Sequence, residues 1–321
     1  MPELLKVNDV RLNYITMRGI VKALDGVSFS LNEGETLAIV GETGSGKSTL
    51  AKVITRSWEE NARIVSGEVL FEGVDILKLS EEEFRRNYRW VKIAMVPQSS
   101  MNVLNPVMKI ADQMIEPLVL RGVPKVKAIK MAAETLEDVG LPRDVLNRYP
   151  HQLSGGMKQR VVIAMAIQAR PKLVILDEPT SALDVMTQAN IMNLLKRLKR
   201  EHNLTYVFIT HDLALASELA DKVMVLYAGK VAEIGPADEI YTAPKHPYTQ
   251  GLIGSVPTLR EDKKLTYIPG EVPSLINPPP GCRFHPRCPY RMDICSRREP
   301  PLFSVGKEHY AACWLYSNQP Y

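Results

Sequence analysis

The loop formed by residues 41–49 constrains this chain more than any other feature of its sequence. It reads Gly-Glu-Thr-Gly-Ser-Gly-Lys-Ser-Thr and fits the phosphate-loop pattern G-x-x-x-x-G-K-S/T. Glycines let the backbone N–H groups form a nest around a β-phosphate, and a helix beginning there adds its positive end. An apolar run, Thr36–Val40, precedes the loop and a helical stretch follows from Leu50, so a chance glycine-rich turn is the poorer explanation. We expect a nucleotide's phosphates to be held by Gly41, Glu42, Thr43, Gly44, Ser45, Gly46, Lys47, Ser48 and Thr49.

A second feature supplies carboxylates for hydrolysis. Four apolar residues, Leu173–Leu176, form a candidate buried strand that ends in Asp177 and Glu178. Asp177 is suited to bind Mg²⁺ through water, as Ser48 is to ligate it directly, and Glu178 is suited to activate the attacking water. An apolar run ending in acidic residues is common by itself. Combined with the phosphate loop, it predicts an ATPase that uses Mg²⁺.

A third segment, Leu153–Arg160, reads LSGGMKQR. A serine and two glycines that open a helix form another anion site, made of free N–H groups, a hydroxyl and the helix dipole. One bound nucleotide does not need two such sites far apart in the sequence.

The remaining pattern predicts an α/β fold. Continuous apolar strands, such as Leu173–Leu176 and Tyr206–Thr210, alternate with helical stretches, which favours a mostly parallel sheet covered on both faces. We predict one domain over residues 1–245, with a helical part at about 99–160. The proline-rich text PGEVPSLINPPPGCRFHPRCP at 269–289 indicates a linker and a small cysteine-bearing module within a C-terminal extension, 246–321.

Composition excludes several classes of protein. With 321 residues and 45% hydrophobic residues, the chain can bury a sizeable core. A formal net charge of +4 is too small to argue for nucleic acid as a partner. No apolar run reaches the roughly 18–20 residues of a membrane helix, and the start, MPELLKVNDV, does not look like a secretory signal. We expect a soluble, intracellular chain that would reach a membrane only by docking on other subunits.

The segment LSGGMKQR resembles the signature of ATP-binding-cassette (ABC) ATPases, and other motifs of that family follow in order over roughly residues 4–240. The resemblance implies a RecA-like nucleotide-binding domain with an antiparallel β subdomain and a helical subdomain. It implies that Tyr14 stacks on adenine, that Gln98 belongs to the Q-loop beside Mg²⁺ and the catalytic water, and that His211 senses the γ-phosphate. It also places Asp184 in the D-loop. Each has a plainer alternative: a strand aromatic, a turn cap, a structural histidine and a helix cap.

The same resemblance accounts for the two anion sites. In that family two cassettes sandwich ATP head to tail, so that each phosphate loop faces the signature of the other cassette. It implies that four residues of this chain contact the ATP of a second subunit: Ser154, Gly155, Gly156 and Gln159.

The C-terminal sequence indicates which subfamily of ABC ATPases the chain resembles. The segments HPYTQGL, IPGEVPSL and PPGCRFHPRCPYRMDIC resemble the C-terminal extension of oligopeptide and dipeptide importer ATPases, in particular their D-type subunit. The resemblance implies a second, related cassette as partner, two membrane permease subunits and, indirectly, an extracellular substrate-binding protein. The chain would then lie at the cytoplasmic face of the membrane. Peptides, oligosaccharides and nickel all remain open as substrates.

Four cysteines fall in the C-terminal extension: Cys282, Cys288, Cys295 and Cys313. Four thiolates can hold zinc or an iron–sulfur cluster, and the C-x2-C pairs common in structural zinc sites are absent from the sequence. The resemblance implies a [4Fe–4S] cluster in some family members. We therefore expect an iron–sulfur cluster, with zinc or four free thiols as alternatives.

Two other classes of function compete with import. The first is a soluble cassette ATPase of DNA repair or translation, but such proteins usually carry two cassettes in one chain or long insertions. The second is a regulatory or iron-handling protein in which the cassette is secondary. The presence of Glu178 and His211 argues against a degenerate cassette.

Overall fold

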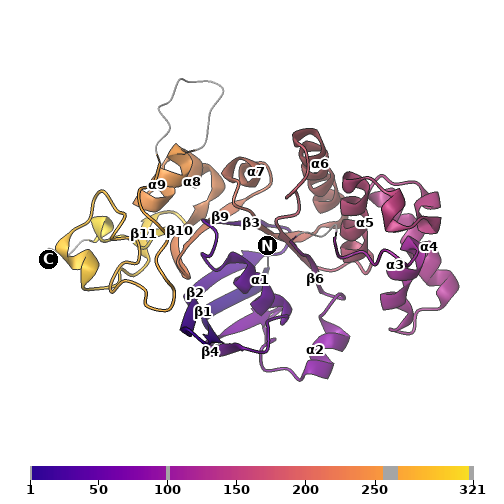
Figure 1. Cartoon of the computed structure of the whole chain (residues 1–321), viewed down its shortest axis with the longest axis horizontal. Helices are drawn as coiled ribbons and strands as arrows, with labels where there is room; N and C mark the ends of the chain where they lie inside the picture. The colour runs from indigo at the N-terminus through magenta and orange to yellow at the C-terminus, as the bar shows by residue number, and fades with distance from the viewer. Residues whose placement is uncertain (1, 99–101, 256–266, 318–321) are drawn as a thin grey trace. The chain divides into compact units, whose positions relative to one another are not determined.

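The computed structural model describes residues 2–98, 102–255 and 267–317 (Figure 1). The chain divides into two compact units, one of Met1–Lys78 with Phe208–Tyr321 and one of Leu79–Val207. Strand β8 (Thr205–Ile209) runs across the boundary between them. None of the helices in the described ranges is both long enough and apolar enough to cross a membrane.

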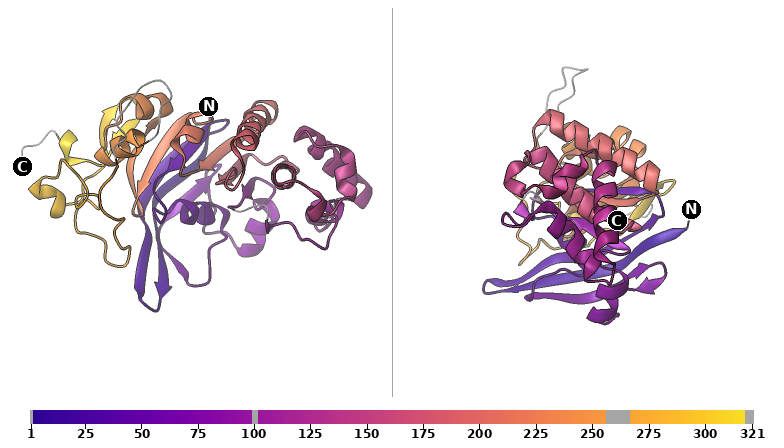
Figure 2. Two further views of the ribbon diagram at one scale, coloured as in Figure 1. Left: turned by 45° about the horizontal axis from the view of Figure 1, so that its top comes forward. Right: turned by 90° about the vertical axis from the view of Figure 1, so that its right-hand side faces the viewer.

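The first unit begins with an antiparallel sheet in the order β2-β1-β4-β5. Its long strands β1 and β2 lie side by side in both views of Figure 2 and pair from Leu5 opposite Leu31 to Tyr14 opposite Val21. Alternate residues are fully buried on each side of a β-bulge between Val7 and Val10: Leu5 and Val7 before it, Val10 and Leu12 after it. The strands of this sheet are β1 (Glu3–Thr16), β2 (Gly19–Asn32), β4 (Ala62–Phe71) and β5 (Val74–Asp75).

The rest of the first unit contributes a mixed set of strands, neighbouring in the order β11-β12-β10-β9-β3. Strands β3 and β9 are parallel, whereas β9, β10, β12 and β11 are antiparallel. The sequence predicted a mostly parallel sheet. The difference arises at Ala228 and Gly229, whose φ angles of 48° and 81° make a tight two-residue hairpin between β9 and β10. The strands are β3 (Thr36–Val40), β9 (Lys222–Tyr227), β10 (Lys230–Pro236), β11 (Phe303–Gly306) and β12 (His309–Ala311).

Helices of the first unit are mostly short. Helix α1 (Lys47–Thr55) follows the phosphate loop and buries Leu50, Val53 and Ile54. The others are α7 (Leu213–Ser217), α8 (Ala237–Thr242) and α9 (Pro247–Gly254), with 3₁₀ turns at Asp293–Ser296 and Trp314–Tyr316.

The C-terminal strands are held to the unit by a buried histidine. His309 on β12 is fully buried, and its Nε2 lies 2.7 Å from Oε1 of the equally buried Glu233 on β10. Its Nδ1 lies 2.8 Å from Oε2 of Glu239 on α8. Because both ring nitrogens lie within hydrogen-bonding distance of carboxylates, these polar contacts fix β12 beside β10 and α8.

The second unit is mainly helical and contains a parallel pair of strands, β6 and β7, in which Ile93 lies opposite Leu173. Helices α3, α4 and α5 pack on one another, as the magenta helices of Figure 1 show, around residues such as Ala128, Leu136 and Val161. The elements are α2 (Glu81–Asn87), β6 (Ile93–Val96), α3 (Ile110–Val119), α4 (Lys125–Asp138), α5 (Gly155–Ile167), β7 (Leu173–Asp177) and α6 (Val185–His202), with 3₁₀ turns at Arg143–Asn147 and Pro150–Gln152.

Candidate functional site

The loop of residues 41–49 needs its glycines. Gly41, Gly44 and Gly46 have φ angles of 148°, 81° and 105°, a region that side-chain-bearing residues rarely adopt. A Cβ on Gly41 would lie 2.2 Å from the carbonyl oxygen of Leu226, and one on Gly46 would lie 2.6 Å from that of Ala23. The loop is therefore wound tightly against β2 and β9 by residues that cannot be replaced without strain.

Four features of the loop fit an anion. A Cβ on Gly44 would meet no protein atom within 4 Å, so the space in front of this glycine is open. The buried hydroxyl of Ser45 has no hydrogen-bond partner among the described residues, and Gly46, the residue before α1, provides no side-chain cap. The Lys47 ammonium donates to the carbonyls of Gly41 at 2.7 Å and Glu42 at 3.0 Å. A phosphate group would supply an acceptor for the Ser45 hydroxyl and for the uncapped helix start, and it could replace the loop carbonyls as the acceptor of Lys47.

Two further predicted residues belong to the same unit as the loop. Tyr14 lies on β1 and is half-buried, and this burial raises the pKa of its hydroxyl. The hydroxyl is hydrogen-bonded to Thr49 at the start of α1. His211 follows β8 and is exposed. Its neighbour Asp212 caps α7 by accepting from the amide of Ala214 at 2.8 Å, which fixes the backbone beside the histidine.

The second unit brings together Gln98 and Glu178. The side-chain amide of Gln98 donates to Oε2 of Glu178 at 2.9 Å. Glu178 has a φ angle of 48°, an uncommon conformation for a side-chain-bearing residue that is often found at functional sites. Asp177, the last residue of β7, is only 3% exposed. At the end of β7, the Asp177 carboxylate is therefore buried, and the Glu178 carboxylate accepts a hydrogen bond from Gln98.

The predicted signature and D-loop meet within this unit. Ser154 caps α5 by accepting from the amide of Met157 at 3.3 Å. Asp184 caps α6 by accepting from the amide of Thr187 at 3.0 Å, and its hydrogen bonds with Thr187 lower the pKa of its carboxyl. A Cβ on Gly156 would lie 2.9 Å from Cγ2 of Thr187. Since Gly156 has no side chain, the starts of the two helices can approach each other closely.

One predicted signature residue, Gln159, is buried inside the unit. Gln159 is on the same helix, but only 2% of it is exposed. Ser154, by contrast, is exposed, and Gly155 and Gly156 are partly exposed. Of the four predicted signature residues, Ser154, Gly155 and Gly156 are therefore the ones open to a partner outside the chain.

The four cysteines correct the expectation of a metal centre. They line one small cavity with Phe284 and Trp314, and all are free thiols. In the described part of the chain, which includes all four, no group of three or more Cys, His, Asp or Glu side chains is arranged to hold a metal ion. Burial raises the pKa of Cys282 to about 12 and that of Cys313 to about 11, which favours neutral thiols over the thiolates that metals require. The prediction of a [4Fe–4S] cluster is therefore wrong, and zinc finds no better support.

Two residues to which the sequence motifs assign no role touch the phosphate loop. The hydroxyl of Tyr248 accepts from the amide of Glu42 at 2.9 Å, and the guanidinium of Arg287 lies 2.7 Å from the Glu42 carboxylate. Both residues come from the C-terminal extension. The sequence signal for both was their place in the segments HPYTQGL and PPGCRFHPRCPYRMDIC, which resemble importer ATPases but do not show what these two side chains contact.

Comparison with known proteins identifies the family. The chain is 48% identical to the dipeptide transport ATP-binding protein DppD of Caldanaerobacter subterraneus subsp. tengcongensis, over 98% of both chains. It is 47% identical to the oligopeptide transport ATP-binding protein OppD of Bacillus subtilis, over 97% of this chain and 88% of that one. The chain belongs to the ATP-binding subunits of dipeptide and oligopeptide ABC transporters. The resemblance drawn from the motifs is thereby confirmed.

The family models and solved structures agree with this membership. The model described as "ABC transporter" matches residues 24–181, and that described as "Oligopeptide/dipeptide transporter, C-terminal region" matches residues 232–295. The dimeric cassette MJ0796 is 32% identical, with a TM-score of 0.65 over 73% of this chain and 98% of that one. The cassette cbiO1 of Clostridium perfringens is 30% identical, with a TM-score of 0.65 over 76% and 92%. As a cassette of this ABC family, the chain is an ATPase.

Proposed function

We propose that residues 41–49 bind the phosphates of ATP and that Tyr14 stacks on its adenine. The observation that carries this assignment is the open, glycine-wound loop with the uncapped start of α1 and the Lys47 ammonium turned into it. Lys47 exchanges its carbonyl partners for β- and γ-phosphate oxygens. Ser48, Asp177 and Gln98 are the residues that would hold Mg²⁺, which neutralises phosphate charge when bound.

We assign Glu178 as the general base. Its carboxylate lies at the end of β7 and is held by Gln98, so it can be aimed at one water molecule. His211 faces solvent at the end of β8, where an imidazole can donate to a γ-phosphate. The role of Glu178 follows from its chemistry and strand position, whereas that of His211 is the one that the resemblance to ABC ATPases implies.

A second cassette completes the site in this proposal. The start of α5 carries an exposed capping serine and two glycines, which form an anion site that the chain's own nucleotide does not use. We assign Ser154, Gly155 and Gly156 to the γ-phosphate of the partner's ATP and Asp184 to the contact between subunits. Support comes from the cassette MJ0796, for which two dimeric structures are known. One of them is a post-hydrolysis state bound to ADP and Pi.

The assembly then drives import. The relatives are named for dipeptide and oligopeptide transport, and we propose peptides as the substrate class, with oligosaccharides as the alternative. Two membrane permease subunits, a related second cassette and an extracellular binding protein are the partners, and the chain works at the cytoplasmic face. ATP closes the cassette pair and hydrolysis resets it.

The test is isolation of the complex. The tagged full-length chain, expressed in its own host, should co-purify with two integral membrane proteins and a second cassette. In proteoliposomes that complex should take up labelled peptide only with ATP and binding protein, and a complex carrying Lys47→Ala should take up none. Recovery with ribosomes or DNA instead of membrane proteins would favour the soluble class of cassette ATPases.

A further inference from the structure

A loop between two cysteines reaches the phosphate loop. Arg287, within residues 282–288, pairs with Glu42 in a two-pronged ion pair: one guanidinium nitrogen donates to Oε2 at 2.7 Å and the other to Oε1 at 3.0 Å. The Arg287 side chain is 6% exposed and that of Glu42 is 29% exposed. A planar, largely buried arginine–carboxylate pair is among the most directional contacts in proteins.

Arg287 is itself held rigidly. Its Nε donates to the carbonyl of Pro269 at 2.8 Å, and its guanidinium lies 5.8 Å from the ring centroid of Tyr227. The proline-rich segment, the aromatic ring and the cysteine-bounded loop therefore fix the direction in which the guanidinium points. The pair raises the pKa of Arg287 further above its ordinary value, chiefly through the hydrogen bonds with Glu42.

Glu42 is fixed at three points. Besides the ion pair, its amide donates to the hydroxyl of the fully buried Tyr248, and its carbonyl accepts from Lys47. The Glu42 carboxylate is an acceptor, so a phosphate does not compete for it. The ion pair with Arg287 can therefore persist when Lys47 turns to a nucleotide.

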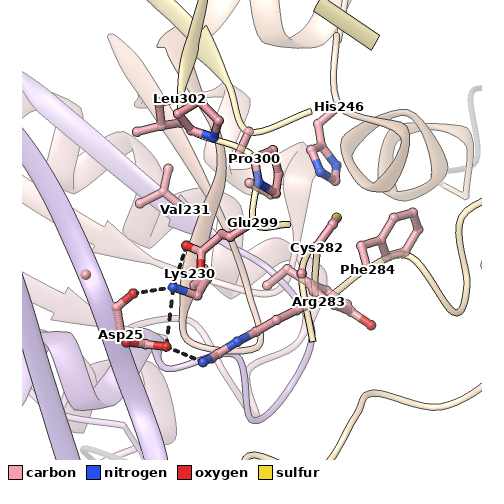
Figure 3. A pocket seen from close by; sticks show the side chains of 16 residues that line it. Asp25, Lys230, Val231, His246, Cys282, Arg283, Phe284, Glu299, Pro300 and Leu302 are labelled. Carbon is pink, nitrogen blue, oxygen red and sulfur yellow. Dashed lines mark hydrogen bonds and ion pairs between the residues drawn. The ribbon is translucent and has the colours of Figure 1, made fainter. Parts of the chain in front are cut away.

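A second arginine docks the other end of the same loop. Arg283 donates to Asp25 on β2 and to the carbonyl of Ala228 at the β9–β10 turn. Figure 3 shows Arg283 and Lys230 converging on Asp25, with Glu299 beside Lys230. The Lys230 ammonium lies 3.3 Å from Asp25 and 2.6 Å from Glu299. Arg283 thus anchors the loop to the sheet, whereas Arg287 alone reaches the carboxylate of the phosphate loop.

We propose that Arg287 is a positioning residue for ATP binding: through Glu42 it holds the phosphate loop in its open, anion-receptive shape. The C-terminal extension thereby sets the ATP affinity of the cassette. A loop already ordered before binding loses less conformational entropy when the nucleotide arrives. The inference rests on the proposed phosphate-binding role of residues 41–49.

The experiment compares Arg287→Gln, Glu42→Gln and the double variant in the full-length chain. Each single variant should raise the Kd and the KM for MgATP about tenfold, within the usual range of coupling between sites, while kcat at saturating ATP falls far less. The double variant should be no worse than either single, since both remove one interaction. Arg287→Lys keeps the charge but not the paired geometry, and should restore only part of the affinity.

Arg283→Gln is the matched control, because it removes an equally buried arginine of the same loop that pairs outside the phosphate loop. It should lower thermal stability and leave the KM for ATP near that of the wild type. If Arg287→Gln lowers stability alone, with the KM unchanged, the proposal is overturned. Should Arg287→Gln fail to fold, the more exposed Glu42→Gln decides by the same criterion.

Lys47→Ala separates this inference from the assignment on which it rests. Loss of ATP binding in Lys47→Ala with normal affinity in Arg287→Gln overturns only the positioning role. Retained binding in Lys47→Ala would overturn the phosphate loop itself, and with it the inference.

Discussion

The side-chain amide of Gln98 donates a hydrogen bond of 2.9 Å to the carboxylate of Glu178. Gln98 follows β6 and Glu178 follows β7, and these strands are parallel neighbours. Parallel strands end at the same edge of a sheet, which is where α/β proteins place their ligands. The bond thus joins two residues that lie 80 positions apart in the sequence at one edge of the second unit.

Replacing Glu178 by glutamine should separate ATP binding from hydrolysis. The amide keeps the shape and a hydrogen bond to Gln98 but cannot accept a proton from water. We expect kcat to fall about 10²–10⁴-fold, the usual contribution of a general base, with the Kd for ATP nearly unchanged. Steady-state phosphate release and equilibrium nucleotide binding measure the two quantities. ATP-dependent dimers should also accumulate in gel filtration. Turnover near that of the wild type would place the base elsewhere.

Ser154 offers a way to separate helix capping from anion binding. Ser154→Ala loses the hydrogen bond to Met157 and should lower the free energy of unfolding by about 1 kcal/mol. Ser154→Asp retains a good cap and should keep the stability, but its charge repels a phosphate. We therefore expect Ser154→Asp to abolish ATP-driven association of cassettes, and Ser154→Ala to weaken it. Association that survives in Ser154→Asp, followed by light scattering with ATP, would argue against the role in trans.

Two glycines of the phosphate loop should respond differently to alanine. At Gly46 the Cβ would lie 2.6 Å from the carbonyl of Ala23, whereas at Gly44 it would meet nothing within 4 Å. Both have positive φ angles, so each alanine costs about 1–2 kcal/mol in backbone strain. Gly46→Ala adds a steric clash and should destabilise the chain by clearly more than Gly44→Ala. Chemical denaturation of the two variants measures the difference, and equal losses would contradict the tight winding of the loop.

The sequence predicted the parts of the site that rest on local patterns. Apolar runs that end in glycine or in acidic residues mark buried strands, and the structure places Gly41 directly after β3 and Asp177 at the end of β7. The serine and glycines at 154–156 predicted the start of a helix, and α5 begins there. These features depend on the strand and helix periods, which are visible in the residues themselves.

The sequence could not predict contacts between distant segments. Arg287 and Glu42 lie 245 positions apart, and no period or spacing relates them. Strand β12 is tied to β10 and α8 by the hydrogen bonds of His309, which also join segments far apart in the sequence. The iron–sulfur prediction was drawn from a resemblance and from cysteine count, and neither reports whether burial keeps the thiols neutral.

Buried His246 should make the stability of the chain depend on pH. Its side chain caps α9 by accepting from the amide of Tyr248 at 3.0 Å, and its ring lies 5.7 Å from that of Phe284. Burial lowers its pKa from the ordinary 6.5 to about 4. Between these two values the unfolded chain binds a proton that the folded chain does not, so folding loses stability as pH falls. The loss is complete near pH 4 and amounts to about 3 kcal/mol.

His246→Asn isolates this contribution, because asparagine is also a good helix cap but does not titrate. The free energy of unfolding in urea, measured from pH 8 to pH 4, should fall more steeply for the wild type than for His246→Asn. The two curves should keep a constant separation above pH 6.5, where the imidazole is neutral in both states of the wild type. Below pH 6.5 the wild-type curve should fall relative to that of His246→Asn. Curves that stay parallel down to pH 4 would show that the folded chain accepts the proton as readily as the unfolded one, and His246 would then not be sealed from water between α9 and Phe284.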